Sequence, residues 1–225
     1  MYGEKAKLVF EKLRDSGLID AKGQIKLSLL GLEVIIDDKS AVGNLLQEWL
    51  GFWMKQNGIY YRTDENTQVP PDFYLSETND KDWLEVKTFD YNECPNFDVA
   101  QFDAYVRDII EKPYRLDADY LILGYTLENG ILQVHDIWLR KIWTITCPSN
   151  DLPLRTQRKQ GKIHNIRPYN FKTNSSVGFQ PFKTRLEFVR AIQGTLNKYD
   201  GAVMDGDEWF NKIKNSYENF TKKPL

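Results

Sequence analysis

The segment 83–89, WLEVKTF, constrains the fold of this chain most, because polar and apolar side chains alternate along it. In a strand, residues two apart project the same way, so Glu85 and Lys87 share one face while Leu84 and Val86 enter the core. A short strand that begins at Asp72 can pair with this segment. The pattern therefore predicts paired strands with a buried side and a side that carries charged groups.

Helical and extended patterns surround this strand. Helical spacing and stop signals predict helices at 4–16, 40–55, 98–111, 138–143, 183–198 and 206–220. Extended patterns predict strands at 25–36, 58–62, 72–75, 119–127 and 130–137, with hairpin turns at Asn129-Gly130 and at Gln160-Gly161. Since helices bracket a mixed sheet, we expect an α/β or α+β fold.

The composition is that of a globular protein. With 225 residues, 41% hydrophobic and 28% charged, the chain can form one compact domain with a sizeable core. No apolar run approaches the roughly 20 residues that cross a bilayer, and the N-terminus does not resemble a signal peptide. We therefore expect a cytoplasmic protein with no membrane partner. The two cysteines, Cys94 and Cys147, give no reason to expect a thiolate metal site or a disulfide.

Charge is unevenly distributed along the chain. The net charge of −2 argues against a general coat for nucleic acid, but it leaves room for a local basic surface. Residues 155–172, RTQRKQGKIHNIRPYNFK, carry six Lys and Arg and no acidic residue. This run is either a solvated hairpin or a surface that contacts phosphate, and charge alone does not decide between them.

Chemistry is concentrated in residues 69–90, where Pro71-Asp72 is followed thirteen residues later by the triplet Glu85-Val86-Lys87. Two carboxylates held close together suit a hard cation such as Mg²⁺, which prefers oxygen ligands and water. An ammonium beside that cation can activate water or neutralise charge at phosphorus. The alternative is a surface ion pair on an edge strand. The upstream Pro-Asp pair favours the site, and the chain's other acidic-x-Lys triplets, 20–22 and 37–39, lack such a pair.

These residues resemble the signature of the PD-(D/E)xK nuclease superfamily. The resemblance implies a mixed sheet flanked by helices, Mg²⁺ dependence and hydrolysis of phosphodiester bonds. More narrowly, residues 96–125, the stretch IWLRKIW and the stretch KIHNIRPYNF are similar to type II restriction endonucleases of the NgoBV/NlaIV group, which cut GGNNCC. That likeness implies cleavage of double-stranded DNA at a palindromic site, and a methyltransferase gene nearby that protects the host.

The resemblance also assigns supporting roles. Glu48 lies on the margin of the 40–55 helix, where many enzymes of the superfamily place an acid that helps to hold metal; the alternative is a solvent-facing Glu. Gln101 and Tyr105 are four residues apart, like the Gln-x-x-x-Tyr pair of the RecB-like branch, and are candidates for active-site support.

We expect a single nuclease domain over 1–225, with a possible helix and strand appendage at 1–35, a catalytic core at 40–125 and a DNA-reading hairpin at 150–172. A homodimer is expected, because two active sites cut a symmetric duplex most simply. The candidate DNA-binding residues are Arg155, Arg158, Lys159, Lys162, Asn165 and Arg167.

Two alternatives stay open: a repair or recombination nuclease of the resolvase or RecB kind, and a DNA-binding module on a nuclease fold without catalysis. The intact Asp72, Glu85 and Lys87 count against the second.

Overall fold

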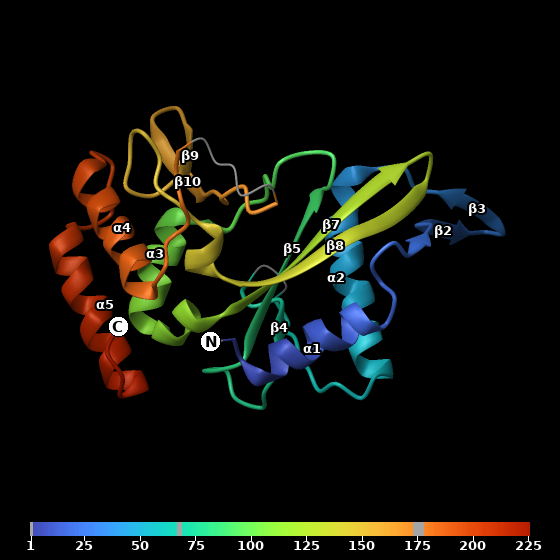
Figure 1. Cartoon of the computed structure of the whole chain (residues 1–225), viewed down its shortest axis with the longest axis horizontal. Helices are drawn as coiled ribbons and strands as arrows, with labels where there is room; N and C mark the ends of the chain where they lie inside the picture. Colours follow the sequence, from blue (N-terminus) through green and yellow to red (C-terminus); the bar gives the residue numbers. More distant parts are fainter. Residues whose placement is uncertain (1, 67–68, 173–177) are drawn as a thin grey trace. The chain divides into compact units, whose positions relative to one another are not determined.

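The computed structural model describes residues 2–66, 69–172 and 178–225 (Figure 1). The chain divides into two compact units, one made of Met1–Cys94 with Asp119–Arg140, the other of Pro95–Ala118 with Lys141–Leu225. Each unit has its own sheet and helices. The predicted catalytic core at 40–125 therefore contributes to both units, since 95–118 belongs to the second. The expectation of a single domain stays a prediction.

The first unit is built on a five-stranded mixed sheet with the strand order β1-β8-β7-β5-β4. Its strands are β1 (Lys22–Gly23), β4 (Phe73–Tyr74), β5 (Trp83–Asp90), β7 (Asp119–Glu128) and β8 (Ile131–Lys141). The pair β5 and β7 is parallel, whereas β4 and β1 pair antiparallel with their neighbours. This mixed sheet, with the helices that flank it, confirms the predicted fold class.

Two helices of this unit pack on the sheet (Figure 1). Helix α1 (Glu4–Asp15) buries Ala6, Val9 and Leu13, which recur at three- and four-residue steps. Helix α2 (Lys39–Gln56) begins after Asp38, whose side chain caps the backbone N–H of Ser40. Both helices share one core cluster with the inner face of β5, so α1 is part of the core. Strand β1 is exposed and joins the edge of the sheet by pairing with β8. The hairpin of β2 (Lys26–Leu29) and β3 (Leu32–Ile35) forms a separate two-stranded sheet.

Three predicted elements in this unit have different bounds in the structure. Segment 58–62 forms only one isolated bridge, between Arg62 and Tyr74. Strand β4 starts at Phe73, so Asp72 immediately precedes it. The predicted helix at 138–143 is wrong over its first four residues, because β8 continues to Lys141 and a short 3₁₀ helix, η2, spans Ile142–Ile145. Alternate residues at the end of β8 are buried, and that period of two belongs to a strand.

In its described residues, the second unit combines three α-helices with a three-stranded sheet of order β6-β10-β9. Its elements are α3 (Phe102–Glu111), α4 (Arg185–Lys198), α5 (Gly206–Thr221), the 3₁₀ helices η1 (Pro113–Asp117) and η2, and the strands β6 (Ala100–Gln101), β9 (Thr156–Lys159) and β10 (Lys162–Ile166). The predicted basic hairpin is confirmed as β9 and β10, because Gln160 and Gly161 both adopt the positive φ of a tight turn. Within the described residues, every helix is too short or too polar to span a membrane.

Candidate active site

Strand pairing in the first unit brings Asp72 beside Glu85. The antiparallel register sets Phe73 opposite Leu84, so the next step of the ladder sets Asp72 against Glu85. Oδ2 of Asp72 accepts a hydrogen bond of 2.6 Å from the backbone N–H of Val86. On the other side, the parallel partner β7 holds β5 in place, with Glu85 opposite Tyr120. The short β4 therefore delivers a second carboxylate to the polar face of β5, as the sequence pattern predicts.

Glu85 is buried although it is charged, with 6% of its surface exposed. Its Oε2 lies 3.6 Å from Nζ of Lys87, one strand step away on the same face. Its Oε1 is buried and has no hydrogen-bond partner among the residues that the structure describes. A buried carboxylate oxygen without a partner is costly, so this site favours an additional cation or proton donor.

Asp72 has an unusual affinity for protons. Burial raises the pKa of its carboxyl to about 6, and the negative charge of Glu85 adds to this effect. The ammonium of Lys87, the N–H of Val86 and the side chain of Gln47 act in the opposite direction and lower the pKa. A carboxyl group whose ionised form is disfavoured by burial and by a neighbouring acid is one that a bound cation stabilises.

Beside Asp72 is a small hollow of about 150 Å³ that takes part of its lining from α2. The residues that line it are Gln47, Glu48, Gly51, Tyr61, Thr63, Asp64, Val69, Pro71, Asp72 and Phe73. The predicted Glu48 is among them, and it is exposed. Among the described residues, no three His, Cys, Asp or Glu side chains group as ligands for one ion. Protein ligands to a cation here would therefore be few, with water and substrate supplying the rest.

Gln47 is a residue of the site that the sequence reading missed. Its side chain donates to the Asp72 carboxylate, as the lowering of the Asp72 pKa reflects. A signal for it exists in α2, where Gly43, Gln47 and Gly51 recur every four residues and so lie on one helix face. A Cβ on Gly43 would lie 3.2 Å from Thr88, and one on Gly51 would lie 3.0 Å from Tyr61. The two glycines let this face approach its neighbours closely.

The predicted pair Gln101 and Tyr105 lies in the second unit. Gln101 is the N-cap of α3, and its side chain accepts a hydrogen bond from the backbone of Ala104. Tyr105 is fully buried, and its ring packs edge-on against Phe188 at 6.1 Å and under the guanidinium of Arg115 at 4.8 Å. Gln101 thus caps a helix and Tyr105 packs in the interior of the second unit. Their support of the active site stays a prediction.

The candidate DNA-binding residues differ in how freely they can reach a ligand. Those that are exposed are Arg155, Arg158, Lys159 and Lys162. Arg167 is tied to its own unit, because its guanidinium pairs with Asp98 and donates to the carbonyl of Asn96. Asn165 donates to Gln157 across the hairpin at 3.2 Å.

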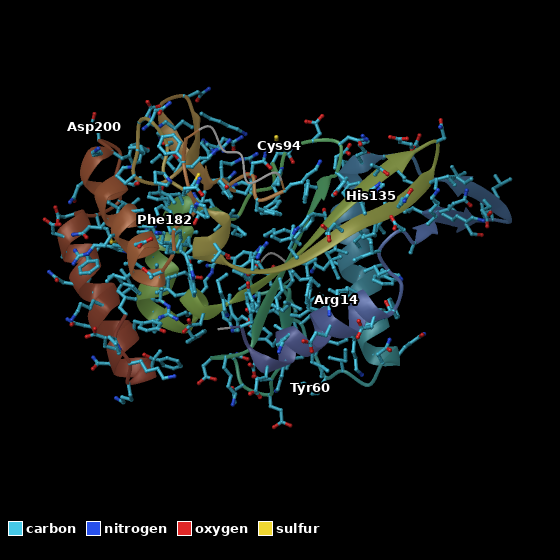
Figure 2. All side chains as sticks on the ribbon, in the orientation of Figure 1. Arg14, Tyr60, Cys94, His135, Phe182 and Asp200 are labelled. Atoms are coloured by element: carbon cyan, nitrogen blue, oxygen red, sulfur yellow. The ribbon has the colours of Figure 1, made fainter. Side chains whose placement is uncertain are left out.

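An open hollow of about 590 Å³ lies beside the hairpin turn in the second unit. Its lining holds the bases Arg158, Lys162 and Lys198 and the acids Asp103 and Asp200, the last of which is labelled at the end of α4 in Figure 2. Basic groups therefore outnumber acidic ones there by three to two. Such a surface suits contact with a phosphate backbone.

Comparison with known proteins decides what kind of protein carries this site. Residues 4–225 match the model of the family described as NgoBV restriction endonuclease. The chain belongs to the NgoBV restriction endonuclease family. It is therefore an endonuclease that cleaves DNA at specific sites, and the predicted resemblance is confirmed.

Individual relatives of this family member agree. The chain is 37% identical to the Type II restriction enzyme NlaIV of Neisseria lactamica over 223 residues, which cover 98% of this chain and 92% of that enzyme. It is 38% identical over 144 residues to the Type II restriction enzyme NgoBV of Neisseria gonorrhoeae, covering 63% of this chain and 82% of the relative. A solved structure of NlaIV restriction endonuclease is similar with a TM-score of 0.91 and 35% identity, over 98% of this chain and 91% of that one.

Membership carries two coarse consequences for chemistry. Restriction endonucleases act on double-stranded DNA, and their family implies a divalent metal cofactor. The residues described here fit such an ion, because Asp72 and Glu85 are adjacent carboxylates and the buried Oε1 of Glu85 lacks a partner. Oxygen ligands of this type suit hard cations.

Proposed function

We propose that this chain is a Mg²⁺-dependent type II restriction endonuclease that hydrolyses phosphodiester bonds of double-stranded DNA at a palindromic sequence. Asp72 and Glu85 hold the metal, and Lys87 completes the catalytic set. The observation that carries the proposal is the buried Oε1 of Glu85, which has no partner among the described residues and lies beside the half-buried carboxylate of Asp72. A hard cation satisfies that oxygen and removes the repulsion between the two acids.

The chemistry follows from what each side chain can do. When bound, Mg²⁺ supplies Lewis acidity to the scissile phosphate and the attacking water. The two carboxylates orient the ligand sphere, and the backbone N–H of Val86 fixes Asp72 within it. The ammonium of Lys87 donates to a phosphate oxygen and stabilises the negative charge that develops during displacement. Burial of Glu85 keeps this charge distribution away from bulk water, which strengthens each interaction.

Two residues of α2 support this site in the proposal. Gln47 orients Asp72 through its side-chain hydrogen bond and keeps more of that carboxyl ionised. Glu48 lines the same hollow and acts on the metal through water, since it does not group with two further acids among the described residues. Loss of Glu48 therefore weakens metal use without abolishing cleavage.

The hairpin of β9 and β10 contacts DNA in this proposal. A two-stranded ribbon of this size fits the major groove, and the exposed Arg158, Lys159 and Lys162 surround its turn. Some of these contacts position the phosphate backbone and others read bases. The active form is a homodimer in the cytoplasm, and a DNA methyltransferase encoded nearby protects the host sites.

The competing nuclease function, a repair or recombination enzyme of the same superfamily, differs in what it recognises. It would select DNA structure rather than sequence. The match over residues 4–225 to a restriction endonuclease family favours sequence recognition.

Digestion of plasmid DNA of known sequence tests the proposal. With Mg²⁺, sequencing of fragment ends should give one short motif with two-fold symmetry, and EDTA should abolish cutting. Replacement of Mg²⁺ by Mn²⁺ should restore it, because both ions accept oxygen ligands. Random ends, ends confined to branched DNA, or cleavage that survives chelation would each contradict the proposal.

A further inference from the structure

The hairpin of β2 and β3 is strongly amphipathic. In its register Leu27 is opposite Val34 and Leu29 is opposite Leu32. Cross-strand partners share a face, and so do residues two apart on one strand. These four aliphatic residues therefore form one side of the hairpin, which we call the apolar face. The opposite side carries Ser28, the ion pair of Lys26 with Glu33 at 2.8 Å, and Ile35 at the base of the hairpin.

The apolar face is uncovered. Its residues Leu27, Leu29, Leu32 and Val34 are 54%, 64%, 72% and 54% exposed, and Leu30 at the turn is 94% exposed. Single exposed apolar residues are ordinary, but four aliphatic side chains on one side of a hairpin are not scattered. A two-stranded hairpin cannot bury such a face by itself. A contiguous apolar surface of this kind marks an interaction site.

The same unit also presents an apolar surface that could receive the hairpin. Leu45, Trp49 and Phe52 of α2 are 39%, 39% and 64% exposed, and their spacing of four and three residues sets them on one helix face. Beside them is a hollow of about 390 Å³. Its apolar lining is Leu18, Ala21, Ile25, Leu45, Leu46, Trp49, Leu132 and Val134. We call the stripe and this hollow together the receiving surface.

The hairpin of β2 and β3 begins next to the receiving surface and projects away from it. Ile25, which lines the hollow, directly precedes β2, and Figure 1 shows the hairpin extending away from the sheet of its own unit. One unit thus carries an apolar projection and an apolar hollow side by side. A two-fold symmetric interface requires this combination, because each copy must offer both halves of the contact.

We propose that the apolar face of each hairpin packs against the receiving surface of a second copy of this chain. The proposal deepens the proposed function, in which two active sites cut a symmetric duplex. The exposed side chains of the hairpin and α2 together offer an area on the order of the ~800 Å² that each partner buries in a standard interface. The charged side of the hairpin, with Lys26 and Glu33, stays in water at the rim.

Sedimentation equilibrium of the full chain, without DNA or metal, tests the inference. Leu29→Glu charges the apolar face, and Phe52→Glu charges the receiving surface. Ser28→Glu is the matched control, because it adds the same charge to the opposite side of the same hairpin. We expect the wild type and Ser28→Glu to have twice the chain mass of 26.4 kDa. Both test variants should dissociate at least 100-fold more readily, with unchanged circular dichroism.

A wild type that is monomeric at micromolar concentration would overturn the inference, and so would test variants that dimerise like the control. Amide hydrogen exchange gives a second readout that needs no variant. Amides of 26–35 should become more protected as the wild type is concentrated, and exchange that is independent of concentration would also overturn the inference. Neither measurement depends on cleavage, so a failure here leaves the proposed catalytic site standing. Loss of that site would likewise leave the interface standing.

Discussion

At the scale of single residues, the proposed catalytic site holds acidic side chains away from water. Glu85 lies on the polar face of β5, yet it is buried beside Asp72, and burial raises the pKa of Asp72 to about 6. An ion pair of Glu85 with Lys87 on the surface would leave the Glu85 carboxylate in water. The burial of Glu85, with Asp72 half-buried beside it, therefore argues against the surface-pair alternative.

The raised pKa of Asp72 predicts how stability of the metal-free protein depends on pH. The folded state binds a proton more tightly than the unfolded state, so the free energy of unfolding should fall as pH rises from about 4 to about 6. In EDTA at pH 7.5, Asp72→Asn should therefore be more stable than the wild type by roughly 1–3 kcal/mol. Denaturant unfolding at pH 5 and 7.5 measures this difference. A variant that is less stable than the wild type at both pH values would contradict the expected sign.

A second residue-scale prediction concerns Gln47. Gln47→Leu removes a hydrogen bond that favours the ionised form of Asp72, so the pKa of Asp72 should rise further. Protons then compete better with metal, and cleavage should need several-fold more Mg²⁺ at pH 7 and recover at high Mg²⁺ or higher pH. Gln56→Leu, at the exposed end of the same helix, is the control. A Gln47 variant with an unchanged Mg²⁺ requirement would rule out this role.

The sequence predicts the charged residues of the candidate site better than the residues that position them. Asp72, Glu85 and Lys87 are linked by local patterns, a Pro-Asp pair and a strand with a period of two. Gln47 reaches Asp72 from a helix 25 positions earlier, and that contact depends on how α2 packs on the sheet. The neighbouring Glu48 is the residue that the sequence favours, because it is charged, although it is more exposed than Gln47.

At the scale of elements, the sequence predicts the hairpin turns and the strands with alternating polar and apolar residues. Helix propensity gives a wrong prediction at the end of β8. The hairpin at Gln160-Gly161 has two residues with positive φ, and the one at Asn129-Gly130 has the same feature. The residue types of 138–141 predict a helix, yet this stretch is the end of strand β8. Leu139 and Lys141, two residues apart, are both buried on one side of that strand. Tertiary burial overrides local preference there.

The β9–β10 hairpin gives a prediction that separates two arginines. Arg158 is exposed beside the turn, whereas Arg167 pairs with Asp98 within its own unit. Arg158→Ala should weaken DNA binding. If Arg158 reads a base, discrimination at one base pair should fall by about 1–3 kcal/mol, and if it contacts phosphate, the salt dependence should flatten. Arg167→Ala should mainly lower thermal stability. Binding to cognate and single-mismatch duplexes, together with melting curves, measures both effects; equal loss of specificity in the two variants would contradict the distinction.

At the scale of the whole molecule, the chain divides into two compact units, and the predicted single domain stays a prediction. Local patterns cannot reveal this division, because it depends on contacts between distant segments. Within the second unit, Trp209 donates to the carbonyl of Val106 and Ser216 donates to that of Ile110, each across more than 100 residues. The parallel pair β5 and β7 demands a crossover, and the chain uses that crossover to begin the second unit.

Metal binding should be visible in the stability of the intact protein. Mg²⁺ and Ca²⁺ that bind only the folded state should each raise the melting temperature relative to EDTA. Ca²⁺ should support DNA binding with little cleavage, because its larger and looser shell positions water poorly. Asp72→Asn and Glu85→Gln should both abolish the metal-induced stabilisation. Equal stabilisation of these variants and the wild type by Mg²⁺ would place the metal elsewhere.

The most direct test of the catalytic assignment is the single-turnover cleavage rate of Glu85→Gln on cognate DNA with saturating Mg²⁺. Glu77→Gln is the matched control, because it makes the same change at an exposed position of the same unit. Glu85→Gln should bind cognate DNA and cleave it about 10²–10³-fold more slowly or not at all, since it removes a charged metal ligand. Glu77→Gln should cleave at the wild-type rate. Cleavage by Glu85→Gln within a few-fold of the wild-type rate would contradict the assignment.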